Sequence, residues 1–165
     1  MSLLRLRQPE RAPSAVALGV AELVDYRLRF WKRGRDGSGK CTITPQEGRS
    51  EPSVQGVLFE LPLVEKQALD RSEGLGEHYH ERQVELAVGA TAIVAWTYVA
   101  APDRIDTSLA PFDWYKELVV QGAREHDLAP SYRRFLDTIQ AHPDPDPVRA
   151  RRARTGIVPE RLSPP

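Results

Sequence analysis

The chain has 165 residues, the size of one ordinary domain that can bury a hydrophobic core. Its 41% hydrophobic and 28% charged residues exclude a disordered or fibrous protein. Basic and acidic residues number 23 each, so the overall charge favours neither nucleic acid nor an anionic membrane as a partner. No apolar run approaches the roughly 20 residues that span a bilayer. The single cysteine, Cys41, excludes an intrachain disulfide framework, and we expect a cytoplasmic protein.

Short elements follow one another along the first 100 residues. Residues 2–7 are expected to form one or two helical turns. Alternating or continuous apolar patterns predict strands at 15–23, 26–31, 40–44 and 54–61. A short helix is expected at 63–72. Two further strands, 79–88 and 91–100, read as a hairpin around Gly89-Ala90.

Helices dominate the remainder of the chain. Apolar side chains at helical spacing predict a helix at 113–126, and Pro130 opens a last helix at 131–140. Residues 142–165 are rich in Pro, Asp and Arg, and we expect them to form an extended or disordered tail outside a domain of residues 1–141. This order favours an α+β fold with a mainly antiparallel, curled, barrel-like sheet, a short helix and two C-terminal helices. The oligomeric state stays open.

The end of the short helix carries a carboxylate. Glu73 closes this helix, and Gly74 provides the left-handed residue that commonly ends one. The negative end of the helix dipole disfavours a second negative charge, so the pKa of Glu73 is expected to rise toward the range of a general acid and base. The alternative is an ordinary solvated carboxylate at a helix end.

Two other clusters were weighed as binding sites. His78 and His80, with neighbouring carboxylates, have a spacing that could hold a metal, but no third spaced ligand is present, and a solvated loop is favoured. A basic run lies near the C-terminus, without the interleaved aromatic residues typical of nucleic-acid binding, at Arg149, Arg151, Arg152 and Arg154. We therefore expect no metal, no cofactor and no nucleic-acid partner.

Several segments, in order, resemble the γ-glutamylcyclotransferase family, which includes AIG2-like proteins. The most specific is Leu69-Asp70-x-x-Glu73-Gly74 followed by Tyr79 and an alternating strand. The strand Val54-Gln55-Gly56-Val57-Leu58-Phe59-Glu60-Leu61 and the helical Tyr115-Lys116 and Gly122-Ala123-x-Glu125 segments also resemble the family. The match covers roughly residues 1–140.

The resemblance implies an enzyme that converts a γ-glutamyl amide to 5-oxoproline and a free amine or amino acid. In that role Glu73 is the general base and then the general acid, and Tyr79, Tyr98 and Tyr115 bind the substrate. The three tyrosines could equally be core aromatic residues. The partner implied is a small γ-glutamyl molecule. The alternative is a catalytically inactive domain of the same fold that binds a small molecule or another protein.

The chain departs from the family at its N-terminus. Family members open with a strand and a Tyr-Gly-Ser-Asn loop that holds the glutamyl end of the substrate, whereas Met1-Ser2-Leu3-Leu4 resembles the residues directly after that loop. Two explanations were considered, a start codon assigned at an internal methionine and a true truncation. The first is favoured, because losing a strand would leave an unpaired sheet edge.

Overall fold

Six strands form two antiparallel sheets in the computed structural model, which describes residues 3–46 and 53–155. The first three strands are β1 (Val16–Leu23), β2 (Tyr26–Arg33) and β3 (Gly39–Pro45). The others are β4 (Val54–Glu60), β5 (Tyr79–Val88) and β6 (Thr91–Ala100). One sheet has the order β4-β1-β5-β6, and β2 and β3 form the second. The two sheets meet where the backbone N–H of Ala100 on β6 donates to Thr42 Oγ1 on β3, at 3.0 Å.

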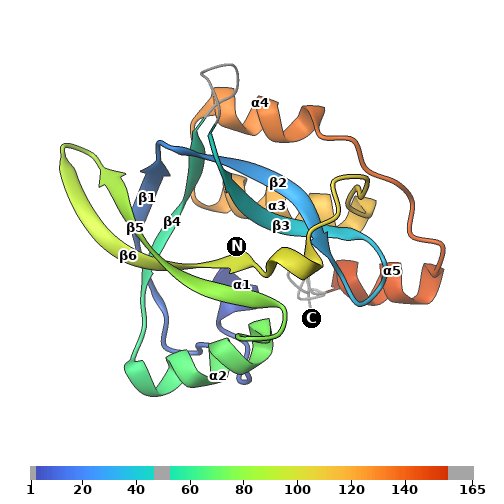
Figure 1. Cartoon of the computed structure of the whole chain (residues 1–165), viewed down its shortest axis with the longest axis horizontal. Helices are drawn as coiled ribbons and strands as arrows, with labels where there is room; N and C mark the ends of the chain where they lie inside the picture. The colour runs from blue at the N-terminus through green and yellow to red at the C-terminus, as the bar shows by residue number, and fades with distance from the viewer. Residues whose placement is uncertain (1–2, 47–52, 156–165) are drawn as a thin grey trace, which may run out of the picture.

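The helices lie around these strands. They are α1 (Leu3–Leu6), α2 (Leu63–Glu73), a 3-10 turn at Pro102–Arg104, α3 (Asp113–Glu125), α4 (Pro130–Thr138) and α5 (Pro147–Thr155). Helix α2 lies at one end of the molecule and α4 at the other (Figure 1). The predicted α+β class with antiparallel strands is confirmed, and the strands curl around the interior rather than lying flat (Figure 1).

The hairpin of β5 and β6 follows the prediction residue for residue. Its register runs from Tyr79 opposite Ala100 to Val88 opposite Thr91. Gly89 in the turn has φ 58°, a conformation that glycine adopts without steric cost. The first residue of this hairpin, Tyr79, is therefore placed directly after the turn that follows α2.

Two groups of buried side chains form much of the core. The larger joins α3 and α4 and includes Leu136, which is 1% exposed, together with Val120, Leu128 and Tyr132. The second joins α2 to the N-terminal segment and consists of Leu6, Ala12, Ala15 and Leu69. Both Ala12 and Ala15 are 0% exposed, so this packing fixes the loop between α1 and β1 against α2.

The expectation of an extended or disordered tail from residue 142 was wrong for part of it, because residues 147–155 form helix α5. Asp146 caps the helix by accepting from the backbone N–H groups of Val148 and Arg149, and Pro147 occupies the first helical position. Ala150 then packs against Trp114 on α3. Residues 156–165 lie outside the described part of the chain.

The side chain of Asp144, which is 0% exposed, ties the start of α5 to α3. It accepts hydrogen bonds from Trp114 Nε1 at 2.8 Å and from Arg149 Nε at 2.8 Å. The hydrogen bonds from Arg149 hold the pKa of Asp144 well below its usual range. Because the folded-state pKa is lowered, the ionised Asp144 stabilises the fold above its unfolded pKa of about 3.9, and this contribution is lost as pH falls through the folded-state pKa.

We therefore expect the indole N–H signal of Trp114 in NMR spectra to stay constant from neutral pH down to about pH 4 and to move only in stronger acid. In the variant Asp144→Asn this acid transition of the signal should disappear. A transition of Trp114 between pH 5 and pH 7 would contradict the assignment.

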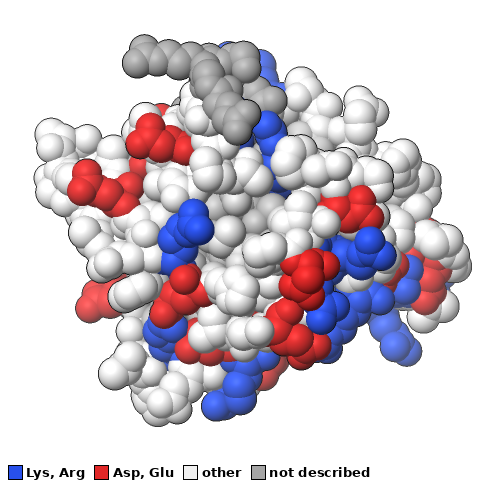
Figure 2. All heavy atoms as spheres, in the orientation of Figure 1, with Lys and Arg blue, Asp and Glu red and all other residues white. Residues whose placement is uncertain are grey.

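Acidic and basic side chains lie next to one another on the face shown in Figure 2, mostly over its lower half and right-hand edge. In the described part of the chain, every helix is too short or too polar to cross a bilayer.

Candidate active site

Glu73 is the last residue of α2, and Gly74 ends the helix in the left-handed conformation, with φ 70° and ψ 49°. The backbone N–H groups of Gly74 and Leu75 donate to the last turn of the helix, at Arg71 O and Asp70 O. A Cβ at position 74 would lie 2.7 Å from Cδ2 of His78. Glycine is thus required here by the backbone conformation and by the close ring of His78.

The turn after Gly74 fixes Tyr79 close to Glu73. The N–H of His78 donates to Gly74 O at 2.7 Å, and the N–H of Gly76 donates to Tyr79 O at 2.8 Å. These bonds close a tight loop of five residues between the helix and β5. Local hydrogen bonds therefore set the position of Tyr79 relative to the end of α2.

The side chain of Glu73 is only 18% exposed, so the alternative of a solvated helix-end carboxylate is wrong. Its Oε1 atom accepts a hydrogen bond from Arg11 Nη1 at 2.7 Å. The Arg11 guanidinium is itself 14% exposed and offsets the unfavourable charge of the helix end. Among the described residues, none donates a hydrogen bond to Glu73 Oε2.

Arg11 was not identified in the sequence. It lies in the irregular segment between α1 and β1, 62 residues from Glu73. The segment is held by backbone bonds such as Ala12 N–H to Leu6 O and by the buried alanines described above. No short motif around Arg11 signals this ion pair, because the pair depends on how the segment packs on α2.

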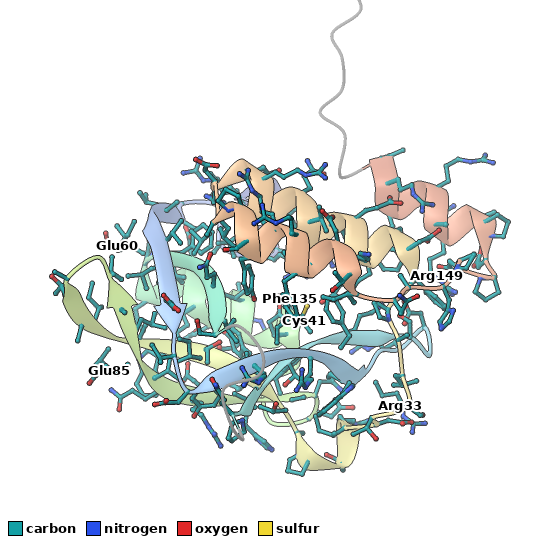
Figure 3. The ribbon with its side chains drawn as sticks, turned by 90° about the horizontal axis from the view of Figure 1, so that it is seen from above. Arg33, Cys41, Glu60, Glu85, Phe135 and Arg149 are labelled. Carbon is teal, nitrogen blue, oxygen red and sulfur yellow. The ribbon has the colours of Figure 1, made fainter. Side chains whose placement is uncertain are left out.

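Tyr79 and Tyr115 meet at one residue of β3. The Tyr79 hydroxyl donates to Cys41 O, and the Cys41 N–H donates to the Tyr115 hydroxyl, both at 3.2 Å. Burial raises the pKa of both tyrosines well above the ordinary value, so both hydroxyls stay neutral. Burial also raises the pKa of the Cys41 thiol to about 11, so it is not a thiolate nucleophile at neutral pH. Figure 3 shows Cys41 in the interior.

The Tyr98 hydroxyl makes a different hydrogen bond from those of Tyr79 and Tyr115. It donates to Asp70 Oδ1 at 2.5 Å, and Lys66 Nζ contacts the same carboxylate at 2.8 Å. The Tyr98 ring packs edge-to-face on Tyr79, with 6.5 Å between the ring centroids. Glu73 is close enough to Tyr79 and Tyr98 for its charge to help raise the pKa of both. Tyr115 is joined to Tyr79 through Cys41, and Tyr98 orders the preceding turn of α2 through Asp70.

A cavity of about 560 Å³ contains Glu73, Tyr79 and Tyr115 in its wall. This volume is in the range of small-molecule sites. The charged side chains that line it include more cations than carboxylates, namely Arg5, Arg11, Lys32, Arg35 and Lys40 against Asp36 and Glu73. The cavity is therefore suited to an anionic ligand.

Two of these cations are neutralised within the wall, because Arg11 pairs with Glu73 and Lys40 pairs with Asp36. Lys40 Nζ lies 2.7 Å from Asp36 Oδ2 and 2.6 Å from Ser38 Oγ. It also lies over the rings of Trp114 and Tyr115, at 4.7 and 4.6 Å from their centroids. Burial raises the pKa of Asp36, but the hydrogen bonds from Lys40 and Ser38 lower it by more, so it is charged at neutral pH.

A second cavity, of about 820 Å³, lies along the apolar face of the four-stranded sheet. Its wall includes Tyr98, Lys66 and Trp96 but not Glu73. We place the candidate active site in the first cavity because that one combines a buried carboxylate with neutral hydroxyls and a surplus of cations.

The two histidines are not brought together on a metal site. His78 is 12% exposed, and its Nε2 atom lies 3.4 Å from Arg35 Nε, whereas His80 is exposed on β5. His78 is therefore packed rather than solvated, contrary to the favoured interpretation. In residues 3–46 and 53–155, no group of three or more His, Cys, Asp or Glu side chains has the geometry to hold a metal ion.

The fold and the cavity together define a class of small α+β proteins that hold a carboxylate at the end of a short helix beside a curled antiparallel sheet. The model of the AIG2-like family matches residues 53–136, half of the chain. The chain belongs to this AIG2-like family, and the predicted membership in the wider γ-glutamylcyclotransferase family is confirmed.

Similar proteins and solved structures support this assignment. The chain is 28% identical over 144 residues to a γ-glutamylcyclotransferase from Bos taurus, and the match spans 84% of this chain and 74% of that protein. A solved structure of a γ-glutamyl cyclotransferase superposes with a TM-score of 0.76 at 24% identity, covering 86% of this chain and 83% of the other, which shows the fold. A solved structure of an uncharacterised protein from Homo sapiens gives a TM-score of 0.72 at 26% identity, covering 80% and 79%.

Proposed function

We propose that the protein is a γ-glutamylcyclotransferase that converts a γ-glutamyl amide to 5-oxoproline and a free amine or amino acid. The observation that carries the proposal is Glu73. Its carboxylate lines a cationic cavity and is held through Oε1 by Arg11, which leaves Oε2 without a hydrogen-bond donor among the described residues. A base that is fixed by one oxygen can take a proton with the other.

The chemistry is an intramolecular aminolysis. The α-ammonium of the glutamyl group gives a proton to Glu73, and the free amine attacks the γ-carbonyl of the same group. The new C–N bond closes a five-membered ring, and Glu73 returns the first proton to the departing nitrogen as the original amide C–N bond breaks. The ring nitrogen still carries one proton too many, which passes through Glu73 to the released amine, so the amine leaves as an ammonium and the ring as neutral 5-oxoproline lactam. Ring closure needs mainly the correct folded conformer, since tethered groups have very high effective concentrations.

The walls of the cavity suit that conformer. Tyr79 and Tyr115 are tied to the backbone of Cys41 by hydrogen bonds, so their rings form a rigid boundary. Their hydroxyls are neutral, and they present no charge that competes with Glu73 for the ammonium. The surplus of cationic side chains matches the carboxylate that every γ-glutamyl group carries.

The proposal is tested by incubating the purified protein with γ-glutamyl amino acids and γ-glutamyl amines and measuring 5-oxoproline by chromatography. Release of 5-oxoproline with an equal amount of amine or amino acid is the expected result. If the protein released no 5-oxoproline from any of these substrates but bound one of them, the result would favour the non-catalytic alternative.

Arg11 is a positioning residue in this proposal, because it acts through Glu73. We expect Arg11→Met to lower kcat/KM by about 10- to 100-fold, the cost of removing one partner from a partly buried charged hydrogen bond. Most of the loss should fall on kcat, because the base loses its orientation while the rest of the cavity stays intact.

Arg11→Lys is the matched variant, since it keeps the charge and should restore part of kcat. Thermal denaturation of each variant separates this role from a general loss of folding. Equal losses in Arg11→Met and Arg11→Lys, in parallel with a lower Tm, would show that Arg11 is a structural residue only.

A further inference from the structure

Lys32 is a buried lysine whose side chain faces the cavity that contains Glu73. It lies on β2 and is 6% exposed. The next residue, Arg33, points the other way, because side chains alternate along a strand. The Arg33 side chain is 60% exposed, pairs with Asp106 at 2.8 Å, and lies at the rim of the molecule (Figure 3).

Among the described residues, none forms an ion pair with the ammonium of Lys32, although the carboxylate of Glu73 is close enough to act on it electrostatically. Its Nζ atom lies 4.9 Å from the ring centroid of Tyr79, in a cation–π contact. Two other lysines of the molecule differ, because Lys40 pairs with Asp36 and Lys66 pairs with Asp70. Burial lowers the pKa of Lys32, and the negative charge of Glu73 opposes that effect.

An ammonium that is buried without a paired acid is costly, and buried charges in proteins are normally paired. When such a group lines a cavity, the missing partner is supplied by a ligand. The ring of Tyr79 under the ammonium compensates part of the cost and fixes its position. Lys32 therefore marks an anion-binding position inside this cavity.

We propose that Lys32 binds the α-carboxylate of the γ-glutamyl group. This inference rests on the proposed function, since it identifies which part of that substrate lies where. The α-carbon of a glutamyl group carries both the reacting amine and the carboxylate. If the amine meets Glu73, the carboxylate must lie a few ångströms away, and Lys32 and Glu73 line the same cavity with Tyr79.

The contact would also orient the reaction. Two substituents of the α-carbon are then fixed. The carboxylate forms an ion pair with Lys32, and the amine gives its proton to Glu73. The γ-carbonyl is then confined to the conformers that fold back toward the amine, which are those that close the ring.

The test uses a substrate whose leaving group has no carboxylate, so that the α-carboxylate is its one anionic group. γ-Glutamyl-p-nitroanilide and its α-carboxamide analogue are compared in the wild-type protein, in Lys32→Met and in the control Arg33→Met. Each substitution removes one positive charge, and the two positions are adjacent on β2, but Arg33 lies outside the cavity wall.

With the carboxylate substrate, Lys32→Met is expected to lower kcat/KM by about 30-fold or more, through a higher KM and a lower kcat, because the contact both binds and orients the substrate. With the carboxamide analogue it should cause no comparable loss. Arg33→Met should stay within about twofold of wild type for both substrates. Lys32→Arg keeps the charge and should recover part of the affinity.

An equal loss with both substrates, an equal loss in Arg33→Met, or full activity in Lys32→Met would overturn the proposal. Folding is followed by Tm, which should not fall in Lys32→Met because the variant removes a buried unpaired charge.

Binding of 5-oxoproline separates this proposal from the proposed function, because the product carries the same carboxylate and needs no turnover. NMR titration should show binding to wild type and weaker binding to Lys32→Met. If the wild type turned over no γ-glutamyl substrate yet this difference persisted, the proposed function would fail and the Lys32 assignment would stand. If the wild type turned over a γ-glutamyl substrate but 5-oxoproline bound equally well to the wild type and to Lys32→Met, the proposed function would stand and the Lys32 assignment would fail.

Discussion

Glu73→Gln is expected to lower kcat/KM for 5-oxoproline formation by about 10²- to 10⁴-fold, the usual contribution of a general acid and base. The amide has nearly the same size and can still accept the hydrogen bond from Arg11, so the cavity should keep its shape. It cannot take a proton from the substrate ammonium. The loss should therefore appear in kcat, with KM changed little.

Glu65→Gln is the matched control for this variant. Glu65 lies on the same helix, and its carboxylate accepts from the backbone N–H of Ser14 at 3.0 Å, outside the wall of the cavity. Its amide can accept the same bond, so activity should stay near that of wild type. Retention of more than a tenth of wild-type kcat/KM in a folded Glu73→Gln protein would remove Glu73 from the role of base.

Leu136→Ala is expected to reduce the free energy of unfolding by about 2–5 kcal/mol, measured by urea denaturation at 25 °C. Leu136 is 1% exposed and packs against Val120, Leu128 and Tyr132 between α3 and α4. Its removal leaves a cavity that this tightly packed group cannot fill. Because Leu136 also lines the candidate active-site cavity, the proposed formation of 5-oxoproline should slow at temperatures where the variant remains folded.

The same substitution at an exposed leucine provides the control. Leu63, at the start of α2, is 80% exposed, and Leu63→Ala should change the free energy of unfolding by no more than about 0.5 kcal/mol. Equal effects at the two positions would show that Leu136 is not part of a specifically packed core.

Elements governed by neighbours in the sequence could be predicted well. The strands at 79–88 and 91–100 and the helix that ends before Gly74 are found as expected. A glycine turn and a left-handed helix end each involve a few consecutive residues, so their signals are local. Helix α5 was missed although the capping pair Asp146-Pro147 was a readable start signal.

The arrangement of the strands could not be read from the sequence. β1 pairs with β4 and β5, which are distant from it along the chain, whereas the consecutive strands β2 and β3 form a sheet of their own. Periodicity states which face of a strand is apolar, but it does not state which strand is its neighbour.

The same division applies to the candidate site. The sequence by itself determined that Glu73 ends a helix at Gly74 and lies near Tyr79, because five residues closed by their own hydrogen bonds leave little choice. The tertiary structure alone decided that Arg11 pairs with Glu73 and that Tyr98 binds Asp70 instead of lining the Glu73 cavity. It also decided that Lys32 lies over the ring of Tyr79 and forms no ion pair with any described residue. Those outcomes depend on which distant segments pack together, since a charge finds its partner through space and not along the chain.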